Sequence, residues 1–329
     1  MVYKPIFDLK ISWMELSANK NAMHVIEANI DKVVWMGLVD NKNENVAYLL
    51  EKYFFSKNIN PPLMDWIYFR SLISKNPFTI SILEKKTHTI DYEYLCLNEN
   101  AIHIIEKRME RINWSSLSCN PNAIHILEEN PDKINWFHLS ANPNAIRILE
   151  KNIDKINWFH LSYNPNAISI LEKNLDKVDW KRLSLNPNAI RILENNFDKI
   201  NWNMLSENPN AIHLLEKNLE KVNWSVLSGN PNAIHILEKN LNKIDWENLS
   251  KNPNAIRIIE ENLDKVSWRY LEKNPNAIHL LAPLNHKAMR EQMEPLKNEL
   301  LEYVLHPLRL RHLSDKLSVD LDVLLSQYQ

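Results

Sequence analysis

The feature that most constrains the fold is a tandem repeat marked by tryptophan. Every one of the 11 tryptophans of this 329-residue chain falls at the same place in one repeating pattern: Trp13, Trp35, Trp66, Trp114, Trp136, Trp158, Trp180, Trp202, Trp224, Trp246 and Trp268. Tyr92 takes the place of tryptophan in one unit, and from there each step is 22 residues. Units this short cannot bury an apolar core alone, so the sequence predicts about twelve units stacked on one another.

Each unit is expected to form two short helices. Asn135 precedes a tryptophan, where its side-chain oxygen can accept a hydrogen bond from a free amide at a helix start. Asn142 and Pro143 predict the start of a second helix, because proline suits the first helical position. Asn152 is expected to end that helix in a left-handed conformation. The predicted fold is all-α, an α-solenoid of helix-turn-helix repeats.

The repeats are expected to cover residues 11–281, with irregular units at 33–91 and regular units at 92–281. Residues 1–10 are an N-terminal cap segment, and residues 282–329 are a C-terminal helical cap that covers the exposed last repeat. With helix layers about 8–10 Å apart, the solenoid would extend on the order of 100 Å.

Two insertions interrupt the irregular units. From Trp35 to Trp66 there are 31 residues, which predicts a protruding loop at 53–64. From Trp66 to Tyr92 there are 26, and the four extra residues lie before Asn76. They are expected to lengthen the first helix of that unit by about one turn.

Composition excludes several classes of enzyme. The chain has only two glycines, Gly37 and Gly229, so it has no phosphate-binding loop, dinucleotide fingerprint or nucleophile elbow. The formal charge of −2 shows no basic excess. Cys96 and Cys119 make neither a disulfide framework nor a zinc site. Neither an apolar leader nor an uncharged 18-residue run occurs, so we expect a soluble, intracellular protein with no cofactor, metal, membrane contact or small-molecule substrate.

A column of mostly basic residues runs along the second helices: His103, His125, Arg147, Arg191, His213, His235, Arg257 and His279, interrupted by Ser169. Adjacent members lie about 8–10 Å apart, too far to share a zinc ion. The column could follow a phosphate backbone. The simpler interpretation pairs each cation with a glutamate three residues on, as in Arg147 and Glu150. Similarly, the tryptophans are better explained as shared core than as a stacking platform for bases.

The repeat varies most at the first, second and fifth positions after each tryptophan. Spacings of three and four place these positions on one exposed helix face, which stacking extends into a long stripe. Aromatic and cationic side chains concentrate there, a composition typical of interfaces. Chance drift or packing on a neighbouring repeat could also produce such a cluster. The predicted partner-binding residues are Phe137, His138, Phe159, His160, Tyr163, Lys181, Arg182, Arg269 and Tyr270.

The pattern Ile-Asn-Trp-x-x-Leu-Ser-x-Asn-Pro-Asn-Ala-Ile resembles the tandem-repeat proteins that giant DNA viruses (mimivirus-like) encode in many copies. The resemblance covers residues 11–281, and the stretch at 299–309 also resembles the tails of such proteins. It implies a viral origin and a repeat architecture. It also implies a place in the cytoplasm of the infected host cell, with the virion as the alternative.

The sequence therefore predicts a non-enzymatic scaffold for protein–protein interaction, with a viral or host partner bound by the variable stripe. The alternative is a single-stranded RNA-binding solenoid that uses the same residues. Near-neutral charge and acidic stripe residues such as Glu207 and Glu247 count against RNA. A third hypothesis, an enzyme in the irregular N-terminal units, lacks any recognisable constellation of catalytic residues.

Overall fold

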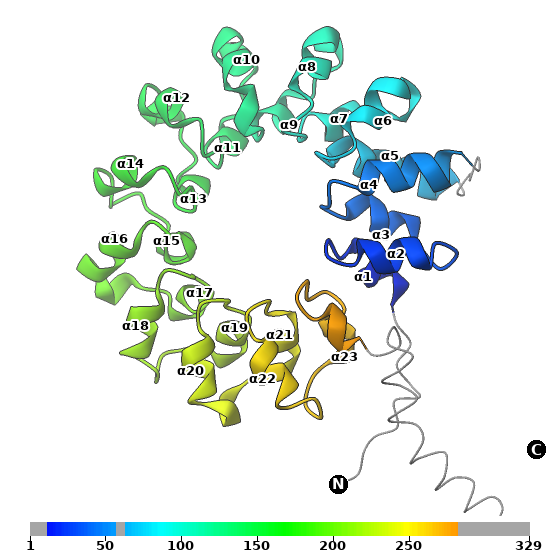
Figure 1. Cartoon of the computed structure of the whole chain (residues 1–329). Helices are drawn as coiled ribbons and strands as arrows, with labels where there is room; N and C mark the ends of the chain where they lie inside the picture. The colour runs from blue at the N-terminus through cyan, green and yellow to red at the C-terminus, as the bar shows by residue number, and fades with distance from the viewer. Residues whose placement is uncertain (1–11, 57–62, 282–329) are drawn as a thin grey trace, which may run out of the picture. The chain divides into compact units, whose positions relative to one another are not determined.

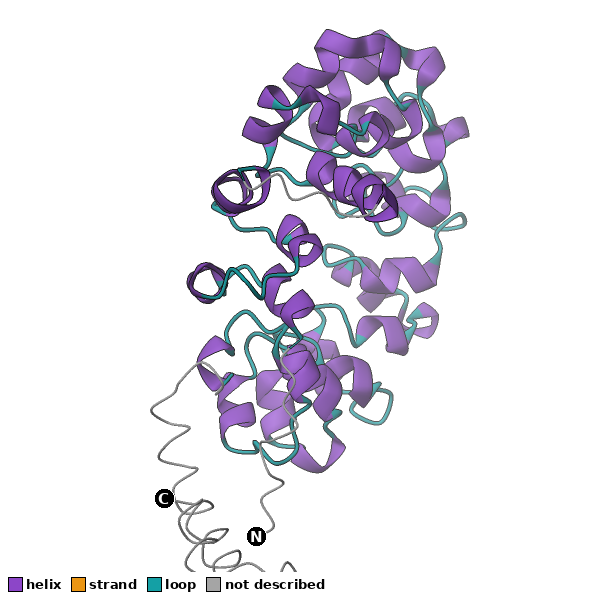
Figure 2. Cartoon of the chain, turned by 90° about the vertical axis from the view of Figure 1, so that its right-hand side faces the viewer, coloured by secondary structure: helices purple, strands orange, loops and turns teal. Residues whose placement is uncertain are grey.

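A computed structural model describes residues 12–56 and 63–281, and every regular element in this part of the chain is helical (Figures 1 and 2). The chain divides into two compact units, residues 1–278 and 279–329. The first unit carries the repeats, and an all-α solenoid of short paired helices is confirmed. Among the described helices, none is both long and apolar enough to cross a membrane.

Each repeat contributes two helices in the order that the sequence predicts. The first helices are α1 (Trp13–Ala18), α3 (Trp35–Asp40), α5 (Leu63–Lys75), α7 (Tyr92–Leu95), α9 (Trp114–Ser118), α11 (Trp136–Leu139), α13 (Trp158–Leu161), α15 (Trp180–Leu185), α17 (Trp202–Leu205), α19 (Trp224–Ser228), α21 (Trp246–Lys251) and α23 (Trp268–Leu271). The second helices are α2 (Met23–Ala28), α4 (Val46–Leu49), α6 (Ile80–Lys85), α8 (Ile102–Ile105), α10 (Ile124–Glu129), α12 (Ile146–Glu150), α14 (Ile168–Glu172), α16 (Ile190–Asn195), α18 (Ile212–Glu216), α20 (Ile234–Glu238), α22 (Ile256–Glu260) and the 3₁₀ turn η10 (Ile278–Leu280). A π-helix, η2 (Leu50–Phe55), follows α4, and other 3₁₀ segments are η3 (Thr87–Thr89), η4 (Glu106–Arg111), η5 (Pro121–Ala123), η6 (Pro131–Lys133), η7 (Ile153–Lys155), η8 (Phe197–Lys199) and η9 (Leu241–Lys243).

The first helices begin where the side-chain caps predict. The Asn135 side chain accepts a hydrogen bond from the backbone N–H of His138 at 3.2 Å, so α11 begins at the tryptophan. Val34, which has no side-chain acceptor, precedes α3 without such a bond. Leu139, three residues after the tryptophan, is fully buried. The predicted start and buried side of the first helices are confirmed.

The second helix begins at Ile146, so the prediction that it begins at Pro143 is wrong. The predicted cap residue, Asn142, is 1% exposed and links two repeats instead. Its Nδ2 donates to the backbone oxygens of Ser118 and Asn120 in the preceding repeat, at 3.1 and 3.0 Å. Its Oδ1 accepts from a backbone N–H two residues on, which shapes the turn before the helix.

The end of the second helix also differs from the prediction. Asn152 has φ −137° and ψ 51°, which is not left-handed. Its Nδ2 donates to the backbone oxygen of Ile148 at 2.8 Å. A side-chain amide therefore satisfies a free carbonyl at the helix end, the task that a left-handed residue would otherwise make possible.

Equivalent asparagines form a continuous ladder through all the repeats. Each is buried, and each donates from Nδ2 to two backbone oxygens of the preceding repeat: Asn19, Asn41, Asn76, Asn98, Asn120, Asn142, Asn164, Asn186, Asn208, Asn230, Asn252 and Asn274. For the first repeat, the preceding repeat is the twelfth. Asn19 donates to the backbone oxygens of Glu272 and Asn274, at 2.9 and 3.2 Å.

The first unit is therefore a closed ring of repeats (Figure 1). The expectation of an open solenoid of about 100 Å, whose last repeat needs a C-terminal cap, is wrong. Twelve similar repeats complete a circle if each turns by about 30° relative to its neighbour, so small rotations accumulate into closure. The first repeat covers the face of the last one.

The irregular repeats depart from the predicted loop. Phe54 lies in η2 and is 2% exposed, with its ring 4.5 Å from the ring of Phe69. The predicted protruding loop at 53–64 is therefore wrong for its first residues, which pack as a π-helix. Residues 57–62 lie outside the described residues. The four extra residues before Asn76 do lengthen a first helix, because α5 has 13 residues.

The predicted N-terminal cap segment, residues 1–10, lies outside the described residues. The predicted C-terminal helical cap, residues 282–329, lies outside them as well. Both remain predictions from the sequence.

Candidate functional site

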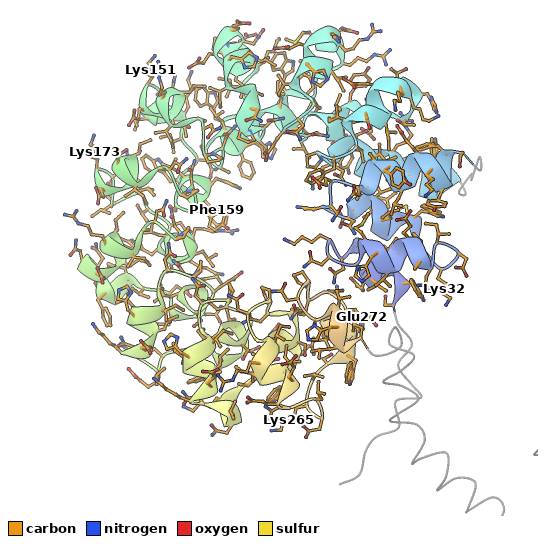
Figure 3. The ribbon with its side chains drawn as sticks, viewed as in Figure 1. Lys32, Lys151, Phe159, Lys173, Lys265 and Glu272 are labelled. Carbon is orange, nitrogen blue, oxygen red and sulfur yellow. The ribbon has the colours of Figure 1, made fainter. Side chains whose placement is uncertain are left out.

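The variable stripe of the first helices faces the inside of the ring. Figure 1 shows α9 to α21 on the inner side of the ring and the second helices of these repeats on the outer side. Phe159 in α13 points to the inside in Figure 3, whereas Lys151 and Lys173, which follow α12 and α14, point outwards. We call the surface formed by the first, second and fifth positions after each repeat tryptophan the inner face.

Seven of the predicted binding residues come from three consecutive first helices, α11, α13 and α15. We call them the inner cluster: Phe137, His138, Phe159, His160, Tyr163, Lys181 and Arg182. The ring centres of Phe137 and His160 lie 4.0 Å apart. The guanidinium carbon of Arg182 lies 4.3 Å from the ring centre of Phe159. Each phenylalanine therefore contacts the imidazole or guanidinium of the next repeat.

These contacts leave much of the aromatic surface accessible. Phe137 and Tyr163 are each 50% exposed, and Phe159 is 43% exposed. In contrast, Leu139 of the same helix as Phe137 is fully buried. The inner cluster thus presents apolar area on a face that the core does not need, a combination typical of binding surfaces.

The two histidines of the inner cluster are held in fixed positions by hydrogen bonds. His138 Nδ1 lies 2.8 Å from Ser115 Oγ, and His160 Nδ1 lies 3.0 Å from Asn157 Oδ1. Partial burial, and then the positive charges of Arg182 and His138, lower the pKa of His160 below its usual range. His160 is therefore neutral at physiological pH, and its ring acts as a flat partner for Phe137.

The cations of the inner cluster have no acidic partner. Within the described residues, neither Lys181 nor Arg182 forms an ion pair with a carboxylate. Asp179 is the nearest acidic residue in the sequence, but it accepts from the backbone N–H of Arg182 as a helix cap. The inner cluster therefore carries uncompensated positive charge beside exposed aromatic rings.

Arg269 and Tyr270, the other predicted binding residues, lie four repeats beyond α15 and form a second group. Lys251 Nζ lies 3.9 Å from the ring centre of Tyr270. A hydrogen bond to Glu247 is the main cause that raises the pKa of the Tyr270 hydroxyl. The charges of this second group offset one another, in contrast to those of the inner cluster.

The repeat tryptophans are half-buried, and a lysine 19 residues later covers the ring. Lys155 Nζ lies 4.8 Å from the ring centre of Trp136, and Lys177 Nζ lies 5.0 Å from that of Trp158. The same contact recurs for Trp13 and Lys32, Trp202 and Lys221, Trp224 and Lys243, and Trp246 and Lys265. These contacts occupy ring faces that base stacking would need.

The basic column on the second helices pairs between repeats. His103 Nε2 lies 2.9 Å from Glu84 of the preceding repeat. The other pairs of this kind are His125 with Glu106, His213 with Glu194, and His235 with Glu216. The predicted pairing with the glutamate three residues on is wrong for these histidines, because stacking brings the glutamate of the neighbouring repeat within reach.

The cysteines and acidic residues form no recognisable reactive centre in residues 12–56 and 63–281. Cys96 is buried and Cys119 is partly buried, and burial raises the pKa of both thiols. In the same part of the chain, no three His, Cys, Asp or Glu side chains are grouped to hold a metal ion.

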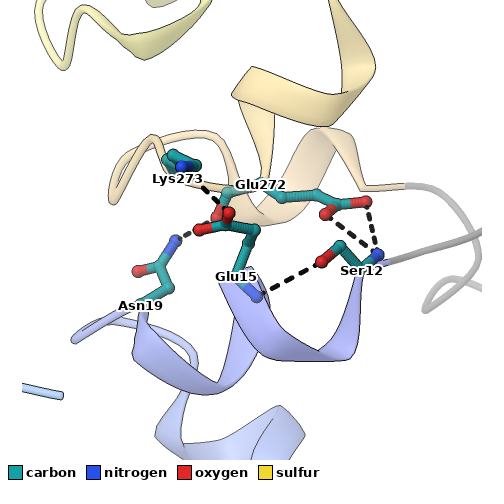
Figure 4. Close-up of polar contacts among 5 residues, drawn as sticks. All are labelled: Ser12, Glu15, Asn19, Glu272 and Lys273. Carbon is teal, nitrogen blue, oxygen red and sulfur yellow. Dashed lines mark hydrogen bonds and ion pairs between the residues drawn. The ribbon is translucent and has the colours of Figure 1, made fainter. Parts of the chain in front are cut away.

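The residues that close the ring were not singled out from the sequence. We call the interface between the twelfth and first repeats the seam (Figure 4). Both carboxylate oxygens of Glu272 lie 3.0 Å from the backbone nitrogen of Ser12, which donates to them. Lys273 Nζ lies 2.9 Å from Glu15 Oε1. One sequence signal could have revealed the seam, because Glu272 stands where the seven preceding repeats have serine.

Comparisons of the chain with known protein families, curated proteins and solved structures find no match.

Proposed function

We propose that this protein is a non-enzymatic scaffold that binds another protein, viral or host, through the inner face of its ring. The observation that carries the proposal is the inner cluster. There, exposed aromatic rings and unpaired cations from three consecutive repeats lie together on a surface that is free of core packing. The resemblance to giant-virus repeat proteins suggests that the partner is met in the cytoplasm of an infected cell.

Two physical arguments favour a protein partner. Aromatic residues and arginine dominate the binding energy of protein interfaces, because they bury large areas with few rotatable bonds. In addition, the asparagine ladder fixes each repeat on its neighbour, so little ordering entropy is lost when a partner binds a surface already in place. A regular frame with variable inner residues is how repeat proteins present extended binding surfaces.

The experiment is an affinity capture from extracts of virus-infected cells, with the double variant Phe159→Ala and Arg182→Glu. Both substitutions are on the inner face and leave the buried leucines and asparagines intact. We expect loss of the captured partner with unchanged helical circular dichroism and melting. The matched control is Arg147→Glu on the second helix α12, where Arg147 is exposed, and it should capture as the natural protein does. Unchanged capture by the double variant would exclude the inner cluster as the binding site.

Single-stranded RNA is the second candidate, because aromatic rings beside cations also suit base stacking and phosphate contacts. Acidic residues of the inner face oppose it: Glu93, Glu207 and Glu247 lie in other repeats of the same stripe. A strand that followed the ring would meet these carboxylates. Nuclease treatment of half of each extract distinguishes the candidates, since RNA-dependent capture is lost and protein-dependent capture survives.

A further inference from the structure

The inner cluster differs from the rest of the inner face in its charge. Cations elsewhere on that face have acidic or aromatic neighbours that occupy them, as Lys273 does with Glu15 and Lys251 with Tyr270. Lys181 is exposed and, in the described part of the chain, no carboxylate pairs with it. A negatively charged ligand would therefore meet its strongest unscreened attraction in the sixth to eighth repeats.

The geometry of Arg182 makes it a receptor for a carboxylate. Its guanidinium carbon lies 4.3 Å from the centre of the Phe159 ring. A guanidinium that stacks on a ring through its flat face keeps its N–H donors at the edge, where a carboxylate can accept two of them. Phe159 restricts the motion of the arginine, so a bidentate contact loses less side-chain entropy.

Apolar surface lies next to this charged site. The Phe137 ring packs on His160 at 4.0 Å but stays 50% exposed, and Tyr163 is exposed to the same extent. An aromatic or aliphatic side chain of a ligand could cover these rings and gain the free energy of burying apolar area.

The acidic residues of neighbouring repeats limit the length of an anionic ligand. Glu207 lies on the inner face of the ninth repeat and Glu93 on that of the fourth, and both are exposed. Three repeats at about 8–10 Å per step span roughly 16–20 Å, the length of about five or six extended residues. A long polyanion would have to pass the flanking carboxylates, whereas a short acidic segment would not.

We propose that the inner cluster is a docking site for a short extended acidic segment of a protein. In it, one carboxylate binds Arg182 and Lys181, and an aromatic or aliphatic side chain packs on Phe137 and Tyr163. This inference rests on the proposed protein-binding function and specifies the chemistry of the partner.

The test measures fluorescence anisotropy of a labelled peptide, Glu-Leu-Glu-Phe-Asp-Glu, titrated with the full chain. Two probes accompany it: the same peptide with glutamine and asparagine in place of its acidic residues, and a labelled hexauridine. We expect the acidic peptide to bind at least about tenfold more tightly than the neutral one, since two charge-assisted contacts are lost in the neutral peptide. Arg182→Gln should weaken the acidic peptide by a similar factor, while Arg147→Gln on the outer side should leave it unchanged.

Three results would overturn the inference: equal binding of the acidic and neutral peptides, no effect of Arg182→Gln, or tighter binding of hexauridine than of the acidic peptide. Circular dichroism of each variant shows whether it is folded. If the acidic peptide fails while partner capture still depends on Phe159 and Arg182, the docking chemistry is wrong and the proposed function stands. If capture fails as well, both are wrong.

Discussion

The seam and the internal interfaces of the ring use the same backbone geometry with different side chains. Between the sixth and seventh repeats, Ser140 Oγ accepts from the backbone N–H of Asn157 at 2.9 Å and donates to the backbone oxygen of Trp136 at 2.7 Å. At the seam, the carboxylate of Glu272 takes the place of this hydroxyl and accepts from Ser12. The asparagine ladder crosses both interfaces unchanged, so it is the ladder that sets how repeats stack.

The substitution changes the electrostatics of the interface. Glu272 is only 3% exposed, and burial is the main cause that raises the pKa of its carboxyl group. An ion pair between Glu15 and Lys273 lies at the same interface. A buried carboxylate is costly where a neutral serine would serve, so the seam is expected to be the interface that opens first.

The largest effect is expected when the ladder is broken inside the ring. Asn142→Ala removes three hydrogen bonds and leaves buried backbone groups unsatisfied, which should lower the free energy of unfolding by about 2–4 kcal/mol. Asn19→Ala removes the equivalent bonds at the seam, where the ends can separate while the internal repeats stay folded. Its effect on global unfolding in urea should be smaller, with faster amide exchange in α1 and α23. Equal losses for the two variants would contradict the distinction between the seam and the internal interfaces.

A second effect depends on pH. Because the folded-state pKa of Glu272 is raised, the folded protein retains this proton to higher pH than the unfolded chain does. The associated stability is full below the unfolded pKa and is lost as pH rises through the folded pKa. Glu272→Gln cannot ionise, so it should be more stable than the natural protein at pH 7 and equal to it near pH 4. Urea unfolding at the two pH values tests this, and a difference that grows on acidification would be inconsistent with the buried carboxyl.

The smallest effect is expected for the ion pair of the seam. Lys273 and Glu15 have side chains 42% and 27% exposed, so Lys273→Gln should cost only about 0.2–1 kcal/mol, and less in high salt. Lys85→Gln removes an internal pair of the same length, with Glu51, and serves as the control. A loss well above this range for Lys273→Gln alone would show that the ion pair matters more to closure than the ladder does.

The sequence predicts the repeat unit well because its signals are local. A tryptophan after a capping side chain marks the start of each first helix, as at Asn135, and a cap depends only on residues within one turn. The variable positions also follow from helical spacing, which is why the inner cluster could be proposed before the structure was known. Its position inside the ring depends on the curvature of the whole array.

Other features depend on contacts between repeats, and local reasoning missed them. Asn142 has the sequence context of a helix cap, but its amide serves the preceding repeat. His103 has a glutamate three residues on, but it pairs with Glu84 of the neighbouring repeat. Closure depends on the sum of small rotations between repeats, which no residue pattern encodes alone. Only Glu272, which breaks the serine pattern, hinted at a special interface.

Closure of the ring is tested most directly by zero-length carbodiimide coupling, which joins a lysine to a carboxylate only where the two are in contact. Mass spectrometry of the monomer fraction should then find Lys273 joined to Glu15, whose charged groups lie 2.9 Å apart. The internal pair of Lys52 and Glu27, at 3.1 Å, provides the positive control. Formation of both links within one chain is the result we predict. The internal link without the link between Lys273 and Glu15 would show that the repeats form an open solenoid and would contradict the closed ring.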